Sequence, residues 1–179
     1  MEDFSQLVQG WQTFYTTIAT SSATLVGLLF VALSLKLETV NLTKNSSMRL
    51  LARQTFTTFL YLIGISLTFL IPGQDRFGLG PSLTMIAILG LIITVIELQA
   101  ARPYLTQADN RIVLRRSGIK IAAFVSLLVI AAMILTGADA NILYWMITPI
   151  LFLLFSASLN TWSLLVSVQK DLKRGRAKS

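Results

Sequence analysis

Hydrophobic and polar positions alternate along this chain in long blocks. Five apolar stretches approach or exceed the roughly 20 residues that a helix needs to cross a bilayer; they cover residues 14–37, 50–71, 83–101, 119–136 and 142–168. Turn-forming segments separate them, including Pro72-Gly73 and residues 137–141. The pattern predicts an all-α integral membrane protein in which residues 1–179 form a single transmembrane domain, a bundle of five transmembrane helices.

Two prolines add detail to this prediction. Pro81 is expected in the first turn of the third helix, where its missing N–H has no partner to lose. Pro149 falls inside the fifth stretch and should break its hydrogen-bond ladder and kink that helix.

The positive charge of the chain is confined to alternate connections between these stretches. There are 15 Lys and Arg against 8 Asp and Glu, a formal net charge of +7. Fourteen of the fifteen basic residues fall on one side of the predicted membrane, which predicts an external N-terminus and a cytoplasmic C-terminus. Because topology accounts for the charge, the lipid bilayer is the expected partner and nucleic acid is not.

The basic tail at residues 169–179 is expected to be cytoplasmic. Its basic side chains are candidates for binding anionic lipid at the cytoplasmic face, each worth about 1 kcal/mol near the surface. They are Lys170, Lys173, Arg174, Arg176 and Lys178.

The first stretch leaves a second topology open. Only residues 25–35 are solidly apolar, and a run that short can also be re-entrant or interfacial. Residues 1–35 contain no Lys or Arg, so charge does not exclude four spans with a cytoplasmic N-terminus. Residues 3–12 have apolar positions at helical spacing, which predicts a short amphipathic helix in the outer interface.

The first helix carries one row of small and polar residues along its length. Three hypotheses fit this row: the helix is the buried centre of the bundle, the row lines a pore shared by several copies, or its hydroxyls face lipid. The pore hypothesis requires several copies, and self-association of the protein is expected. It consists of Thr13, Thr17, Thr20, Thr24, Gly27, Val31 and Ser34.

Glu97 is the one carboxylate inside an apolar stretch, which makes it a candidate ion site. It lies about five residues before Arg102, so an ion pair near the cytoplasmic interface is the other hypothesis, with Arg102, Arg53 or Lys120 as its partner. Thr94 lies one turn deeper on the same face and extends a polar track inward.

Two further polar rows predict hydrogen bonds between helices, with a substrate pathway as the alternative. They are Gln54, Thr58, Tyr61 and Thr68 in the second helix, and Ser156, Asn160, Ser163 and Ser167 in the fifth.

The composition excludes much familiar chemistry. The chain has no histidine and no cysteine, so thiol nucleophiles and imidazole or thiolate metal sites are absent. We therefore expect no cofactor, no metal and no enzymatic activity. The function predicted is a homo-oligomeric ion-conducting pore lined by the first helix; the alternative is a non-conducting scaffold or regulatory subunit that binds a partner protein.

One segment resembles a known group of proteins. The run WQTFYTTIATSSATLVGLLFVALSL, residues 11–35, resembles the first helix of an uncharacterised family of small bacterial multi-pass membrane proteins. The resemblance implies a location in the bacterial inner membrane, the plasma membrane of the cell. It implies no activity and no functional residues.

Overall fold

The computed structural model describes residues 4–37, 46–101, 107–137 and 140–176, with side chains described at 4, 6–34, 51–100, 117–137 and 141–163. All regular structure in these ranges is helical. The elements are α1 (Phe4–Gly10), α2 (Gln12–Leu37), α3 (Ser46–Leu70), α4 (Arg76–Ala101), α5 (Gln107–Leu135), the 3₁₀ helix η2 (Ala140–Met146) and α6 (Ile147–Arg176).

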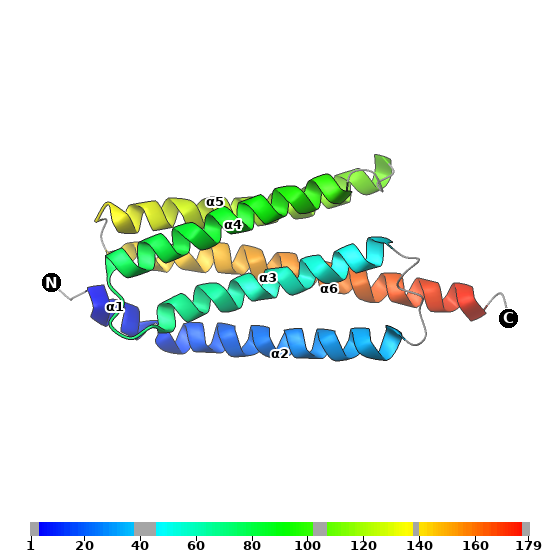
Figure 1. Cartoon of the computed structure of the whole chain (residues 1–179), viewed down its shortest axis with the longest axis horizontal. Helices are drawn as coiled ribbons and strands as arrows, with labels where there is room; N and C mark the ends of the chain where they lie inside the picture. Colours follow the sequence, from blue (N-terminus) through cyan, green and yellow to red (C-terminus); the bar gives the residue numbers. More distant parts are fainter. Residues whose placement is uncertain (1–3, 38–45, 102–106, 138–139, 177–179) are drawn as a thin grey trace.

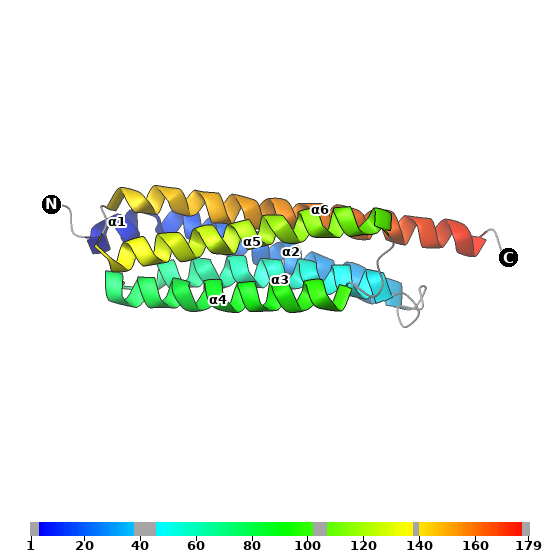
Figure 2. The same ribbon diagram turned by 90° about the horizontal axis from the view of Figure 1, so that it is seen from above.

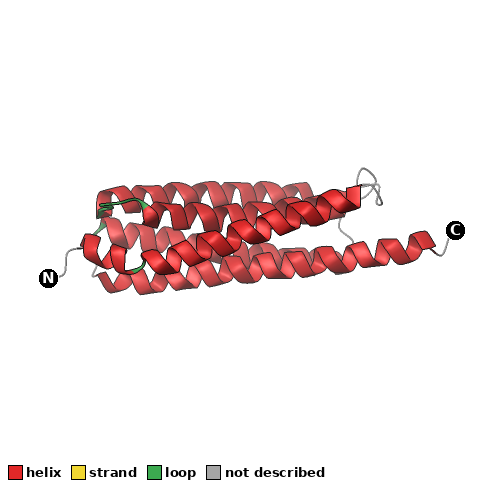
Figure 3. Cartoon of the chain, turned by 90° about the horizontal axis from the view of Figure 1, so that it is seen from below, coloured by secondary structure: helices red, strands yellow, loops and turns green. Residues whose placement is uncertain are grey.

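The five long helices run side by side along one axis (Figures 1 and 2). Helices α3, α4, α5 and α6 pack in a ring, each against the next, and α2 packs against α3 on the outside of that ring. We call the end that carries α1, the α3–α4 turn and η2 the aromatic end, and the opposite end the basic end. Helices α2, α4 and α6 point toward the basic end (Figure 1). Figure 3 shows the same bundle from a third side, with helices as the regular structure of the described residues.

Four helices contain segments long and apolar enough to cross a membrane: Gln12–Ser34, Arg76–Ala100, Ser117–Leu135 and Asn141–Ser163. The first segment is among them, so its length and apolarity are compatible with a full span. Helix α3 is not among them, because its first half carries Arg53, Gln54 and several threonines. The described part of the chain is therefore all-helical, with four helices whose length and apolarity suit a membrane protein.

The outer surface of the bundle is largely apolar. Large hydrophobic side chains are exposed on every long helix, a distribution typical of a surface that contacts lipid tails rather than water. Examples are Leu28, Phe30, Leu67, Ile92, Ile96, Val129, Leu151 and Phe155.

The structure corrects both expectations about proline. Helix α4 already begins at Arg76, so Pro81 lies inside it rather than in its first turn. The start is set instead by Asp75, whose Oδ1 accepts the Gly78 backbone N–H at 2.8 Å as a helix N-cap. Pro149 is the third residue of α6, where a backbone N–H has no helical partner, so it interrupts no ladder inside that helix.

An aromatic cluster holds the aromatic end together. Trp11, between α1 and α2, meets Tyr144 of η2 edge to face with ring centroids 5.2 Å apart. Tyr15 of α2 stacks on Phe69 of α3 at 3.8 Å. The predicted amphipathic helix exists as α1, but its apolar side is turned to the bundle, where Val8 is buried.

Candidate functional sites

Helix α2 lies at the edge of the molecule. Its polar row is exposed throughout, from Thr13, Thr17, Thr20 and Thr24 to Gly27, Val31 and Ser34. The hypothesis that α2 is the buried centre of the bundle is therefore wrong for the single chain. That position belongs to α3, which packs against α2, α4 and α6.

The exposed row faces directly away from the rest of the chain. Three side chains that α2 buries are Tyr15, Ser22 and Leu29, each two positions after a member of the row. At 100° per residue, two positions are about 200° of rotation, so the row and the buried side lie on opposite sides of the helix. We call this exposed side the hydroxyl face.

Three threonine hydroxyls of this face, and that of the neighbouring Thr16, are bonded within the helix. Thr16, Thr17, Thr20 and Thr24 each donate to the carbonyl oxygen four residues earlier at 2.8 Å. This back-bonding makes threonine tolerable in a transmembrane helix, because the hydroxyl that donates to its own helix needs no other acceptor.

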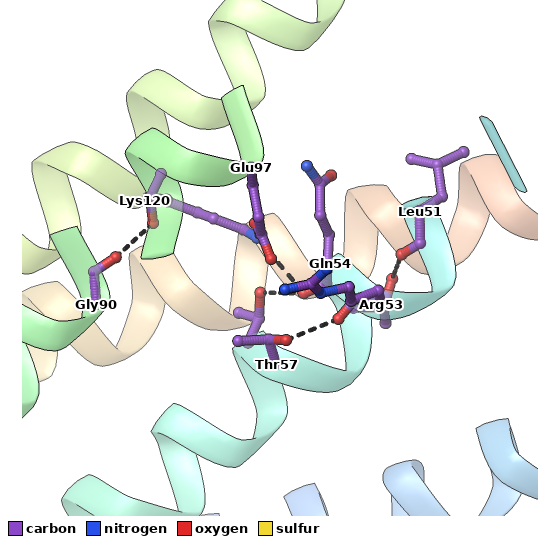
Figure 4. A network of polar contacts seen from close by, with 10 residues as sticks. Leu51, Arg53, Gln54, Thr57, Gly90, Glu97 and Lys120 are labelled. Atoms are coloured by element: carbon purple, nitrogen blue, oxygen red, sulfur yellow. Dashed lines mark hydrogen bonds and ion pairs between the residues drawn. The ribbon is translucent and has the colours of Figure 1, made fainter. Parts of the chain in front are cut away.

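The second candidate site is a buried ion pair between α4 and α5. Lys120 Nζ lies 3.4 Å from Glu97 Oε2, and the two side chains are 6% and 4% exposed. The same ammonium donates to the backbone carbonyl of Gln54 on α3, also at 3.4 Å. Figure 4 shows Glu97 and Lys120 reaching toward the Gln54 turn.

The structure thus selects one of the three partners that the sequence left open for Glu97. Lys120 pairs with it; Arg53 is exposed, and Arg102 lies outside the described residues. The pair could have been singled out from the sequence, because Lys120 falls inside the fourth predicted span just as Glu97 falls inside the third. A charge of each sign in two adjacent spans is itself a signal for a pair.

More polar side chains surround this pair within the ring of α3 to α6. Thr58 donates to the Gln54 carbonyl at 2.7 Å, and Thr94 donates to the Gly90 carbonyl at 2.7 Å. Ser156 and Asn160 of α6 are also fully buried, but their side-chain polar atoms have no hydrogen-bond partner among the described residues, so they do not form the hydrogen bonds between helices that were predicted for this row. Ser163 is half-buried and Ser167 has no described side chain.

We define the polar layer as Gln54, Glu97, Lys120, Ser156 and Asn160. Toward the aromatic end the ring is filled mainly by apolar side chains, and the one fully buried serine there, Ser66, bonds to its own helix. The described interior therefore provides no continuous polar path along a single chain. The apolar filling includes Leu62, Ile65, Leu83, Leu127, Ile134 and Leu153.

The close approach of α4 to α5 depends on Gly90. A Cβ atom there would lie 2.3 Å from the Phe124 ring, closer than real contacts allow. In contrast, a Cβ at Gly27 on the hydroxyl face would meet nothing within 4 Å. The two glycines, which look alike in the sequence, therefore face different surroundings.

The remaining candidates are the basic residues of the predicted tail and any metal site. The backbone of α6 stays helical through Lys170, Lys173 and Arg174 to Arg176, so most of the predicted tail continues the last helix, while Lys178 lies outside the described residues. Within the described part of the chain, no group of three or more acidic, histidine or cysteine residues could hold a metal ion.

No protein-family model, no curated protein and no solved structure matches the chain. The resemblance of residues 11–35 to a bacterial membrane family therefore stays a prediction.

Proposed function

We propose that the protein is a homo-oligomeric, ion-conducting membrane protein in which α2 helices from several copies surround a shared axis. The observation that carries the proposal is the direction of the hydroxyl face. A helix that meets only lipid on its outer side is expected to be apolar there, and α2 turns its threonines outward. Around a common axis this face meets other copies and water.

The filled interior of the single chain supports a path between copies rather than within one. Apolar side chains occupy the ring of α3 to α6 toward the aromatic end. On the proposed axis, hydroxyls of Thr13 to Thr24 form the wider mouth and Gly27 to Ser34 the narrower section.

The proposal includes five spans, an external N-terminus and a cytoplasmic C-terminus in the bacterial inner membrane. Helix α3 is counted as the fifth span because it is 25 residues long and lies between α2, α4 and α6. Its polar side chains, such as Thr55 and Thr58, are turned inward, so its lower apolarity does not expose them to lipid. The basic side chains after Val168 then meet anionic lipid at the cytoplasmic face.

A second candidate function is a non-conducting scaffold or regulatory subunit. It is favoured by the hydrogen bonds of the hydroxyl face, since threonines that donate to their own helix do not need water. The exposed Ala23 and Gly27, four positions apart, would let a helix of a partner protein approach closely. In neither candidate does a side chain have a catalytic role.

The first test is the mass of the full-length protein in a lipid nanodisc or mild detergent, measured by native mass spectrometry. We expect a closed oligomer that Gly27→Leu dissociates. Gly118→Leu is the matched control, because Gly118 is also exposed and open but lies on α5. A monomeric native protein would remove the pore, because one α2 cannot enclose a channel.

The second test separates the two candidates. Ion flux into vesicles is compared for the native protein, Thr24→Leu and Glu97→Gln. The pore predicts flux that falls in Thr24→Leu, whereas an oligomer without flux supports the scaffold. An unchanged ion preference in Glu97→Gln assigns Glu97 to the ion pair and not to the conducting path.

The orientation can be tested independently. The native chain contains no cysteine, so Asp3→Cys provides a single thiol. A membrane-impermeant reagent added outside the cell should label it; labelling that requires permeabilised cells would place the N-terminus inside.

A further inference from the structure

The polar layer contains more hydrogen-bonding atoms than hydrogen bonds. Glu97 Oε1, Ser156 Oγ and both amide atoms of Asn160 are buried and have no hydrogen-bond partner among the described residues. The hydroxyl of Tyr61 is also buried without a hydrogen-bond partner among the described residues. Buried polar groups without a protein partner are rare in native proteins, and the usual explanation is a bound water or ion.

Helical spacing places Ser156 and Asn160 within roughly 9 Å of the level of Lys120 along the bundle axis. Ser126 of α5 and Thr148 of α6 line the same surface pocket, which gives the approximate register of the two antiparallel helices. Eight residues from Thr148 toward the basic end, or roughly 12 Å, lead to Ser156. The same count along α5 from Ser126 ends within one turn of Lys120. Asn160 follows one turn further and, being fully buried, faces the seam with α3 and α5.

The ion pair has unused hydrogen-bonding capacity, which a small bound molecule or ion could satisfy. Both contacts of Lys120 Nζ are 3.4 Å long, whereas charge-assisted bonds of this kind are usually about 2.7–2.9 Å. An ammonium has three donors, and only two of them are used here. One oxygen of Glu97 is unused as well.

The chemistry of the unpaired atoms indicates which kind of ion or small molecule could bind in the polar layer. A cation would suit Glu97 Oε1 but would lie beside the Lys120 ammonium and leave the Asn160 amide donors unpaired. An anion would suit Lys120 but would face the Glu97 carboxylate. A bound molecule that both donates and accepts hydrogen bonds satisfies all of these groups. Water does so and is small enough for a layer in which Asn160 is 0% exposed.

We infer that the polar layer binds a cluster of water molecules that bridges the Glu97–Lys120 pair to Asn160 and Ser156 of α6. This site is separate from the hydroxyl face and does not depend on the oligomer. It connects α6 to the charge pair of α4 and α5, which otherwise has no described polar contact with that helix. The cluster also solvates a charge pair that would be costly in a dry interior.

The first test is radiolytic hydroxyl-radical footprinting of the full-length native protein in a nanodisc, in ¹⁸O water. Radicals formed from the internal waters should label Phe124, which packs against Tyr61 one turn from Lys120, although Phe124 is only 1% exposed. Leu83, fully buried in the apolar filling of the ring toward the aromatic end, is the control, with labelling normalised to the intrinsic reactivity of each side chain. Normalised labelling of Phe124 at least fivefold above that of Leu83 supports the cluster; equal labelling overturns it.

The second test uses the sign of a stability change. Replacing Asn160 by leucine keeps the side chain at a similar size and removes both unpaired amide atoms. A dry layer predicts a higher Tm, because a costly unpaired group is lost; a water cluster predicts a Tm lower by several degrees and weaker labelling of Phe124. Ser66→Ala, which removes a buried hydroxyl bonded to its own helix, should leave the labelling unchanged. A higher Tm in Asn160→Leu would overturn the inference.

Discussion

The protein has two polar regions within helices of similar length, and their surroundings are opposite. The hydroxyl face of α2 is exposed, and three of its four threonines are bonded to their own helix. The polar layer is buried among four helices, and several of its atoms are unpaired. The first region is satisfied without a partner, whereas the second needs one.

This difference shows what polarity means in a membrane bundle. Residues that bond locally, such as Thr20, place no demand on tertiary structure and can be moved from inside to outside at little cost. Buried residues whose polar atoms are not bonded within their own helix, such as Lys120 and Asn160, need neighbours, so they fix the register of the helices that carry them. We expect stability to reside in the polar layer and association to reside in the hydroxyl face.

The largest effect is expected when one member of the ion pair is removed. Lys120→Met should cost about 3–5 kcal/mol of unfolding free energy, because Glu97 is left charged and buried without its partner. The double variant Lys120→Met with Glu97→Met should recover most of that loss. Unfolding in denaturant, followed by circular dichroism in detergent micelles, measures both.

The control for this experiment is Arg53→Met, at an exposed basic residue near the same end, which should change stability by less than about 0.5 kcal/mol. If the double variant were as unstable as the sum of its two single variants, the pair would not be energetically coupled.

A smaller effect is expected at the glycine beneath Phe124. Gly90→Ala should cost about 1–3 kcal/mol, since the new Cβ would overlap the ring and push α4 from α5. Gly27→Ala on the hydroxyl face should be neutral or slightly stabilising, because it meets nothing within 4 Å and alanine favours helix. The same unfolding assay compares them.

A second substitution tests the cause. Phe124→Leu in the Gly90→Ala background removes the ring that the Cβ would meet, so it should restore part of the lost stability. An equal penalty at Gly27 and Gly90 would mean that the helices do not pack as described.

The sequence predicted the helices well because their extent depends on local properties. The expected stretches 14–37 and 50–71 correspond to α2, Gln12–Leu37, and α3, Ser46–Leu70. The predicted starts of two helices were wrong. Asp75 caps α4 and begins it ahead of Pro81, and η2 takes the residues that were assigned to the start of the fifth helix.

The sequence could not predict which face of each helix is buried. In a soluble protein apolar residues mark the inside, but lipid tails are as apolar as a protein core, so the same rule fails here. The polar row on α2 and the polar row on α6 look alike in the sequence. The row on α2 is exposed, whereas Ser156 and Asn160 of the row on α6 are 0% exposed. The choice depends on which helices pack together, and here α3 rather than α2 occupies the centre.

The smallest effect is expected on the hydroxyl face itself. The double variant Thr20→Val with Thr24→Val should change the unfolding free energy of the single chain by less than about 0.5 kcal/mol, because both hydroxyls are exposed and bonded only to their own helix. Thr58→Val on α3 is the matched control and should cost about 1 kcal/mol, since that buried hydroxyl donates to the carbonyl that also accepts from Lys120. The variants are compared in detergent conditions where mass measurement shows monomers. A larger loss from the α2 pair than from Thr58→Val would mean that the hydroxyl face already contributes to the fold of one chain, and that the division between a stabilising layer and an associating face is wrong.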